Sequence, residues 1–178
     1  MKVKVKICGI RTLDAAQTAI NTGADFLGFN FVLTSKHYIK PGLAKKIIKE
    51  LKGRIKTVGV FQNAKINFVN KIVNDLDLDY VQLHEKRIIK SVKDKETYLL
   101  IDREKQGAGQ TPNLNNAKVF ARKLKIFFAG GLTPNNVAKI VKKVKPYAVD
   151  VAGGVETNGI EDVNKIKQFI SNAKGVAI

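Results

Sequence analysis

The hydrophobic positions of the chain follow two alternating periods. Short runs rich in β-branched and aromatic residues recur between stretches in which apolar residues repeat every three to four positions. This alternation is typical of parallel strands joined by crossover helices, so it predicts an α/β fold. We expect strands at about residues 2–8, 25–31, 55–61, 79–83, 97–102, 125–129 and 147–151, with helices between them, for example at 41–52 and 134–143.

The stretch 86–96 decides the number of strands, because seven are one fewer than an eightfold (β/α)-barrel needs. In KRIIKSVKDKE, Ile88, Ile89 and Val92 share one helical face. A helix of this length spans about 16 Å, as a five-residue strand does. The alternative, in which IIKSV is a strand, leaves too few residues for parallel crossovers. The sequence therefore predicts one condensed (β/α) TIM-type barrel domain, residues 1–178, with one βα unit missing or shortened around residues 85–97.

The composition and charge of the chain indicate which kinds of partner it binds and in which compartment it works. The 178 residues carry a net charge of +17, from 32 Lys and Arg against 15 Asp and Glu. The lysines recur throughout the helical segments, so we interpret them as a solvated surface that attracts a small anionic substrate, and we expect no nucleic-acid partner. No apolar run is long enough to cross a membrane and the N-terminus does not read as a secretory signal, so we expect a cytoplasmic protein without a membrane partner.

Side-chain alternation in the first strand places charged and reactive groups inside the barrel. Val5 and Ile7 share the face that packs under helices, so Lys6 and Cys8 point inward, with Cys8 at the carboxyl end where barrel enzymes keep their active sites. By the same parity Asp150 points inward from the last strand. Because the first and last strands are neighbours in a closed barrel, we predict a buried Lys6–Asp150 ion pair with a separation of at most about 4 Å.

Two residues at strand ends are candidates for proton transfer. Cys8 is the only cysteine, which excludes an intrachain disulfide and a structural zinc cluster. It is either a small buried hydrophobe or a base whose pKa is lowered by Lys6. Asp102 ends the apolar run YLLI and either caps the following turn or acts as an acid, for which partial burial would favour the protonated form.

Two glycine pairs follow the last two predicted strands: Gly130-Gly131 and Gly153-Gly154. Single glycine turns are uninformative, but these two loops of a (β/α)-barrel commonly bind phosphate through backbone N–H groups, and glycine allows the close approach that this requires. Phosphate binding is favoured over plain turn chemistry. The polar, glycine-bearing stretch 103–116 is expected to be a loop of functional length.

Eight segments of the chain match one family in order: VKICGI (5–10), GADFLGF (23–29), SKHYI (35–39), VGVFQN (58–63), YVQLH (80–84), LLID (99–102), AGGLTPNNV (129–137) and VKPYAVDVAGGVE (144–156). In these segments the chain resembles the phosphoribosylanthranilate isomerase family. The resemblance implies an Amadori rearrangement of N-(5-phosphoribosyl)anthranilate to 1-(2-carboxyphenylamino)-1-deoxyribulose 5-phosphate in tryptophan biosynthesis. It also implies a phosphorylated small-molecule substrate, no cofactor or metal, and a monomer or homodimer.

The resemblance assigns roles to individual residues. Cys8 is implied as the general base that removes the proton from ribose C2, and Asp102 as the general acid that protonates the ring oxygen. Further positions are implied as substrate-binding: His37, Gln82, Gly107, Gly109, Gly130, Gly131, Asp150, Gly153 and Gly154.

Several positions depart from the family pattern at substrate contacts. His37 stands where the family has an arginine that contacts the anthranilate carboxylate, Gln110 stands for a lysine, and Ala152-Gly153 stands for two serines. Each lost charged or bidentate contact is expected to cost about 1–3 kcal/mol of binding. We therefore expect retained activity with weakened recognition. Because protonated His37 would restore a charge, we also predict activity that rises as the pH falls toward 6.

Three other functions compete with this interpretation. A related isomerase of histidine biosynthesis has an aspartate at the end of the first strand and a longer chain, so Cys8 and the length argue against it. A non-catalytic barrel homologue that binds a sugar phosphate or a partner protein stays open as the alternative. Nucleic-acid binding rests on charge alone and would show as salt-sensitive affinity for generic DNA.

Overall fold

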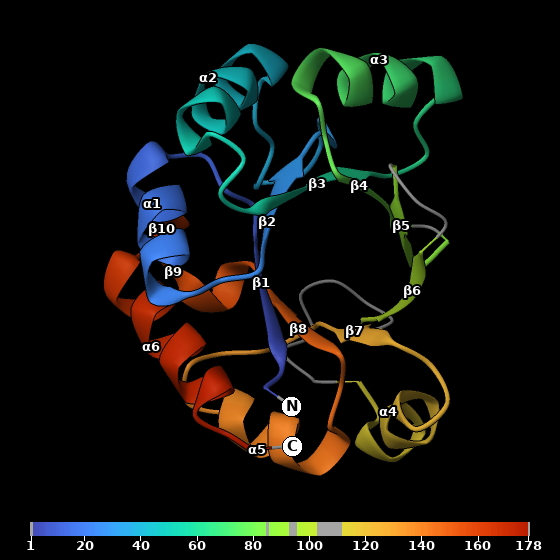
Figure 1. Ribbon diagram of the computed structural model, residues 1–178, viewed down its shortest axis with the longest axis vertical. Coiled ribbons are helices and arrows are strands. Elements are labelled where there is room, and N and C mark those ends of the chain that lie inside the picture. Colours follow the sequence, from blue (N-terminus) through green and yellow to red (C-terminus); the bar gives the residue numbers. More distant parts are fainter. Residues whose placement is uncertain (1, 85, 93–95, 103–111, 178) are drawn as a thin grey trace.

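A computed structural model describes residues 2–84, 86–92, 96–102 and 112–177, and in this part of the chain the strands form a closed barrel in the order β1 to β8 (Figure 1). The barrel strands are β1 (Lys4–Cys8), β2 (Phe26–Asn30), β3 (Lys56–Phe61), β4 (Tyr80–Leu83), β5 (Ile88–Ser91), β6 (Thr97–Ile101), β7 (Ile126–Phe128) and β8 (Ala148–Val151). The helices are α1 (Leu13–Thr22), α2 (Pro41–Leu51), α3 (Ile66–Leu76), α4 (Leu114–Ala121), α5 (Val137–Val144) and α6 (Val163–Lys174). A 3-10 turn, η1 (Gly153–Val155), and a small hairpin, β9 (Glu156–Thr157) with β10 (Ile160–Glu161), follow β8.

The α/β barrel predicted from the sequence is confirmed, and each of the seven predicted strands overlaps an observed one. Helix α2 begins at Pro41, as the prediction for 41–52 requires. Helix α5 begins later than predicted, at Val137 rather than near Pro134. The side chain of Asn136 accepts a hydrogen bond from the backbone N–H of Thr133, 2.9 Å away, which closes a turn over the residues before the helix.

The prediction of a helix at 86–96 and of a barrel with seven strands is wrong. Strand β5 occupies Ile88–Ser91 and pairs antiparallel with both β4 and β6, which completes the closed barrel. A parallel strand at this place would need long crossovers, for which the chain has too few residues. An antiparallel strand needs only a short turn, and the Lys86 and Arg87 N–H groups close that turn on the carbonyls of Leu83 and His84. Between β4 and β6 the described residues contain no helix.

The inside of the barrel is filled by apolar and aromatic side chains. Phe26 packs edge-on against Tyr80 and Phe127, and Tyr98 packs against Phe127 at a centroid distance of 5.3 Å. Tyr98 also stacks on Tyr147 at 5.0 Å. Side chains from seven strands, β2 to β8, belong to this inner cluster, so they pack the antiparallel segment against the rest of the sheet.

The stretch 103–116 is only partly described. Residues 103–111 lie outside the described residues, and α4 begins at Leu114, so the last three residues of the expected loop are helical. The side chain of Asn113 accepts hydrogen bonds from the backbone N–H groups of Asn115 and Asn116 and so caps the helix.

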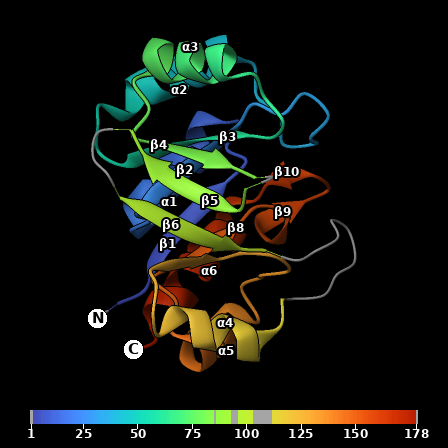
Figure 2. The same cartoon turned by 90° about the vertical axis from the view of Figure 1, so that its right-hand side faces the viewer.

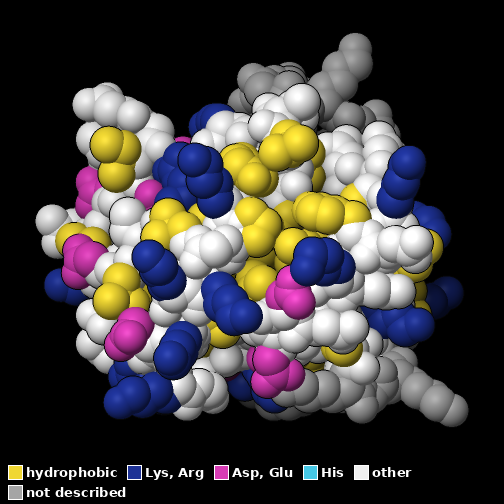
Figure 3. Space-filling view, turned by 90° about the horizontal axis from the view of Figure 1, so that it is seen from above, with side chains coloured by type: hydrophobic (Ala, Val, Ile, Leu, Met, Phe, Trp, Pro, Cys, Tyr) yellow, Lys and Arg dark blue, Asp and Glu magenta, His cyan; other side chains and the backbone are white. Residues whose placement is uncertain are grey.

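The basic side chains are dispersed, as the sequence indicated. On the face formed by α2 and α3, lysine and arginine side chains stand among apolar and acidic ones and do not gather in a single patch (Figure 3). In the part of the chain that is described, no helix combines the length and the hydropathy that crossing a bilayer would require.

Candidate active site

A buried polar network lies in the barrel between β1, β4 and β8. The Nζ atom of Lys6 lies 2.8 Å from Oδ2 of Asp150 and 2.8 Å from Oε1 of Gln82. Lys6 is fully buried, and Gln82 and Asp150 are 3% and 6% exposed. The predicted ion pair is therefore confirmed. Gln82, implied by the resemblance as a substrate contact, is placed by the structure against Lys6, and its substrate role stays a prediction.

Lys6 and Asp150 each favour the charged form of the other. Burial acts to lower the pKa of Lys6, but the attraction of Asp150 and the nearby Cys8 outweighs it and raises the pKa overall. Asp150 uses one carboxylate oxygen for Lys6, while its Oδ1 is buried and has no hydrogen-bond partner among the described residues. The network thus presents one unused acceptor next to Cys8.

Cys8 ends β1, and the local backbone leaves room for its sulfur. Its neighbour in β2 is Gly28, where an added Cβ would lie 2.7 Å from Cys8 Sγ. Burial raises the pKa of Cys8 to about 11, although Lys6 pulls in the opposite direction. Of the two alternatives left open by the sequence, a thiol whose pKa is lowered overall by Lys6 is not supported, because desolvation of the thiolate outweighs the attraction of Lys6. Gly28 itself was not singled out from the sequence, although a glycine inside a strand indicates a close approach.

The raised pKa of Cys8 predicts its reactivity. We expect its rate of alkylation by iodoacetamide to rise about tenfold per pH unit from pH 7 to pH 9.5 without levelling off, because only the thiolate reacts. Mass spectrometry reads this directly, since Cys8 is the only cysteine. Free glutathione in the same samples is the control and should level off near its own pKa. A Cys8 rate that levels off below pH 9 would contradict the buried, high-pKa thiol.

Asp102 follows β6, at the carboxyl end of that strand. Its Oδ2 lies 3.4 Å from Nε2 of His84, which follows β4, and the two side chains are 21% and 27% exposed. Asp102 is also near enough to Asp150 for its charge to raise the pKa of that carboxyl group. His84 belongs to the YVQLH segment, but sequence reasoning gave it no role. Its proximity to Asp102 depends on the antiparallel β5, which was not predicted.

The two glycine pairs meet at one end of the barrel. Gly130 and Gly131 have positive φ angles of 86° and 68°, and neither donates its backbone N–H to another described residue. Gly154 lies against the carbonyl oxygen of Leu132, where any Cβ would overlap that oxygen. The loops after β7 and β8 therefore come together, and only glycine fits at position 154.

Arg11 forms ion pairs with two glutamates of the segment after β8. Its Nη2 atom lies 3.0 Å from Oε1 of Glu156 and 3.1 Å from Oε2 of Glu161. Both glutamate side chains are almost completely buried. Neither Arg11 nor Glu156 was identified from the sequence, because their partners lie about 150 positions away. The contacts hold the segment that carries Gly153 and Gly154 over the barrel mouth.

His37 lies next to the same glutamate. Its Nδ1 is 3.0 Å from Oε1 of Glu156, and its ring packs over Gly9. Burial lowers the pKa of His37 below its ordinary value of 6.5; Glu156 opposes this shift, and Lys36 and Arg11 add to it. This shift disfavours the protonated imidazole, so it argues against the predicted rise of activity toward pH 6.

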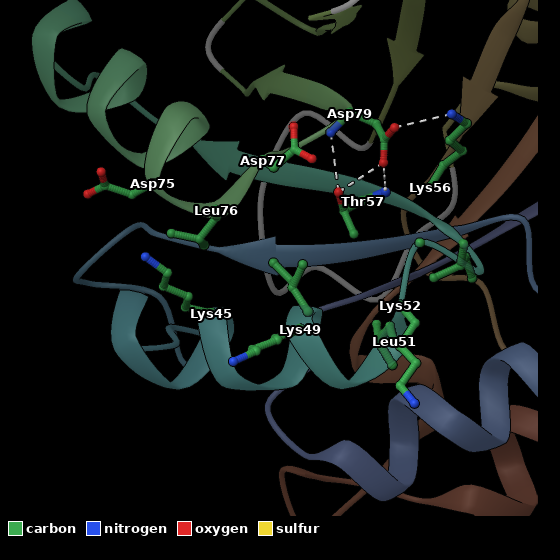
Figure 4. Close-up of a pocket in the computed structure, with 13 residues that line it drawn as sticks. Lys45, Lys49, Leu51, Lys52, Lys56, Thr57, Asp75, Leu76, Asp77 and Asp79 are labelled. Atoms are coloured by element: carbon green, nitrogen blue, oxygen red, sulfur yellow. Dashed lines mark hydrogen bonds and ion pairs between the residues drawn. The ribbon is translucent and has the colours of Figure 1, made fainter.

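A groove of about 510 Å³ lies at the opposite end of the barrel, between α2 and α3 (Figure 4). Lysines of α2 line one side, and Asp75, Asp77 and Asp79 line the other. Two of these carboxylates are already held: Asp75 pairs with Lys71 at 2.7 Å, and Asp79 pairs with Lys56 at 3.1 Å. The amino ends of barrel strands serve stability rather than catalysis, so this groove is not our candidate site.

Comparison with known proteins shows the family to which this chain belongs. The family model of N-(5'-phosphoribosyl)anthranilate isomerase matches residues 5–94 and 85–172. This chain belongs to that family. A phosphoribosylanthranilate isomerase of Citrifermentans bemidjiense is 38% identical over 203 residues, with 98% of each chain covered, and one of Bacillus cereus is 39% identical, with 97% of this chain and 98% of that one covered.

Solved isomerases of the family share the fold. The phosphoribosyl anthranilate isomerase from Thermotoga maritima gives a TM-score of 0.84 at 31% identity, over 98% of this chain and 100% of that one. A structure of such an isomerase in complex with reduced 1-(o-carboxyphenylamino)-1-deoxyribulose 5-phosphate gives 0.78, with the same identity and coverage. An alignment of 203 positions is longer than this 178-residue chain, so the relative carries residues that have no counterpart here. The two segments matched by the family model meet at residues 85–94, around β5.

Part of the candidate site lies outside the described residues. Gly107, Gly109 and Gln110 fall in the segment 103–111, so their roles stay predictions. In the rest of the chain, the structure brings Cys8 and Asp102 each within electrostatic reach of Asp150.

Proposed function

We propose that this phosphoribosylanthranilate isomerase family member catalyses the Amadori rearrangement of N-(5-phosphoribosyl)anthranilate in tryptophan biosynthesis, in the cytoplasm and as a single domain. The observation that carries the proposal is the position of Cys8 and Asp102. Cys8 ends β1 and Asp102 follows β6, so both lie at the carboxyl end of the barrel, and each interacts electrostatically with Asp150 of the buried Lys6–Asp150 pair. A base and an acid at the same end of the barrel are what the rearrangement needs.

The proton transfers follow from this geometry. Asp102 gives a proton to the ring oxygen, so the C1–O bond breaks, the sugar opens and a C1=N iminium forms. Cys8, as the thiolate, takes the proton from C2 and leaves an enolamine with a C1=C2 double bond. C1 then takes up a proton and the C2 hydroxyl releases one, which gives the ketone of the product. Lys6 stabilises the thiolate that Cys8 must form, and the free Oδ1 of Asp150 accepts a hydrogen bond from a substrate hydroxyl or amine. His84, 3.4 Å from Asp102, orients the acid.

The substrate phosphate binds at the two glycine-bearing loops that follow β7 and β8. The unengaged N–H groups of Gly130 and Gly131 and the neighbouring Gly153-Gly154 turn supply backbone donors, and glycine lets the phosphate oxygens approach them. No serine hydroxyl stands at Ala152 or Gly153, so the backbone carries most of this contact. We expect a weaker phosphate affinity than serine-bearing relatives would have.

The anthranilate end of the substrate meets a weaker contact. His37 stands where the family has arginine; it lies next to Glu156, and burial lowers the pKa of its imidazole and so disfavours the charged form. A neutral imidazole offers a carboxylate one donor, whereas a guanidinium offers a charged, bidentate one. The substrate carboxylate therefore contributes less binding energy here, which raises KM more than it lowers kcat.

Turnover of freshly generated N-(5-phosphoribosyl)anthranilate, followed by its loss of fluorescence, tests the proposal. We expect the parent to be active, and Cys8→Ala and Asp102→Ala each to lower kcat by about a hundredfold or more, because each removes one proton-transfer group. Asp75→Ala is the matched control, since this exposed aspartate lies at the opposite end of the barrel. A folded but inactive parent would instead support the alternative, a non-catalytic homologue that binds a sugar phosphate or a partner protein.

A further inference from the structure

The outer face of the barrel is exposed at one place only among the described strands. Outward side chains of β1, β2, β7 and β8, such as Val5, Leu27, Ile126 and Val149, are completely buried beneath helices. In β4, β5 and β6 the outward apolar side chains are all partly exposed: Val81, Leu83, Ile88, Leu99 and Ile101. Figure 2 views these strands face-on between α3 and α4, with no described helix in front of them.

The strand register makes this exposed surface continuous. Leu83 lies opposite Ile88, and Ile88 lies opposite Leu99, so three apolar side chains form one row across three strands. In the next row Val81 lies opposite Lys90. We call the surface of Val81, Leu83, Ile88, Lys90 and Leu99 the uncovered sheet face.

An aromatic side chain borders the uncovered sheet face on the side of α3. Leu83 pairs with Phe61 of β3, and Phe68 of α3 packs edge-on against Phe61 at 6.2 Å. Phe68 is still 41% exposed. The apolar row therefore continues onto the helix at its edge, and an apolar partner could contact both.

Positive charge accompanies the apolar row. Lys86 and Arg87 lie in the turn before β5, Lys90 lies within β5, and all three side chains are exposed. None of the three forms an ion pair with another described residue. The chain as a whole carries +17. A binder of this surface must therefore combine an apolar side with negative charge.

We propose that the uncovered sheet face binds an amphipathic helix of an acidic partner protein. A helix is the element that covers the corresponding outer face elsewhere in this barrel, and its leucine-rich side would replace water over the row of Leu83, Ile88 and Leu99. Acidic residues along its edges would pair with Lys86, Arg87 and Lys90. A second copy of the chain fits less well, because face-to-face contact would bring the same three cations of both copies together.

Fluorescence anisotropy with a labelled synthetic helix tests the proposal. The probe is an amphipathic peptide of about 18 residues with leucine on one face and glutamate on the other. We expect binding to the parent with a Kd of about 10–100 μM. Ile88→Glu and Lys90→Glu should each weaken it about tenfold or more, because one interrupts the apolar row and the other reverses a charge beside it.

Matched variants and peptides separate this site from general attraction to a basic protein. Leu33→Glu is the control for Ile88→Glu, because it introduces glutamate at another exposed apolar residue. Lys142→Glu is the control for Lys90→Glu, because it reverses the charge of an exposed lysine in α5. Both should bind the peptide as the parent does. Far-UV circular dichroism checks that each variant is folded, and the exposed Lys90 provides a variant that should not disturb folding.

Three outcomes would overturn the proposal. The first is no binding by the parent, or equal weakening in the control variants. The second is equal binding of a peptide in which lysine replaces glutamate, which would show that the surface does not select an acidic partner. The third is a dimer in sedimentation that Ile88→Glu alone dissociates, which would make a second copy the occupant.

Discussion

Replacing Lys6 by methionine is expected to lower the free energy of unfolding by about 3–5 kcal/mol, because removal of one partner leaves a buried charge uncompensated. Methionine fills much the same volume, so packing changes little. Asp150 and Gln82 both lose the ammonium group that lies 2.8 Å from each. Urea unfolding at pH 7, followed by far-UV circular dichroism, measures the change.

Two further variants isolate the cause. Lys4→Met removes a lysine of the same strand that is 47% exposed and pairs with Asp25, and it should cost less than about 1 kcal/mol. Lys6→Met combined with Asp150→Asn should regain part of the loss, because the uncompensated charge is gone. A single Lys6→Met variant as stable as the parent would show that the pair contributes no net stability.

The loss in Lys6→Met should also depend on pH. Burial raises the pKa of Asp150, and loss of Lys6 removes the main opposing influence and leaves only the smaller one of His84. A carboxyl group whose folded pKa is raised destabilises the fold as the pH rises through that value. The difference between parent and variant should therefore be smaller at pH 5 than at pH 8.

The alternation of side chains was sufficient to predict this pair. Parity places Lys6 and Asp150 on the inner face of their strands, and closure of the barrel makes β1 and β8 neighbours, so the observed register follows. The same reasoning located Cys8 and Asp102 at carboxyl ends. Such predictions succeed because they depend on a period and on the order of strands, which the sequence contains.

Strand β5 could not be predicted in the same way. Ile88 and Ile89 fit both a helix and a strand, and the choice rested on the assumption that every barrel strand is parallel. The structure resolves it by reversing one strand, so that Gln82 faces Ile89 across an antiparallel pair and a short turn suffices. The reversed strand closes the barrel, and this is favourable because an open sheet would leave two edge strands with unpaired backbone groups.

Contacts between distant loops were also beyond sequence reasoning. Glu156 meets Arg11 and His37 only because the loop after β8 folds back over β1. The lowered pKa of His37 could not be foreseen for the same reason, because its burial depends on those neighbours. Gly28, in contrast, could have been found, because a glycine between Leu27 and Phe29 in a strand indicates that something packs closely there.

Gly154→Ala is expected to lower the free energy of unfolding by about 3 kcal/mol, the upper end of the range for overpacked sites. The new Cβ would overlap the carbonyl oxygen of Leu132, a backbone atom that cannot move by changing a rotamer. The loops after β7 and β8 must therefore separate. Thermal and urea unfolding measure the loss of stability.

Gly42→Ala is the matched control for Gly154→Ala. Nothing lies within 4 Å of an added Cβ at Gly42, which belongs to the first turn of α2, so alanine there should stabilise the helix by up to about 1 kcal/mol. In turnover assays Gly154→Ala should raise KM for the phosphorylated substrate, because its backbone donors move apart. If Gly154→Ala keeps both the parent's stability and its KM, then contact between the two loops is not what shapes the phosphate site.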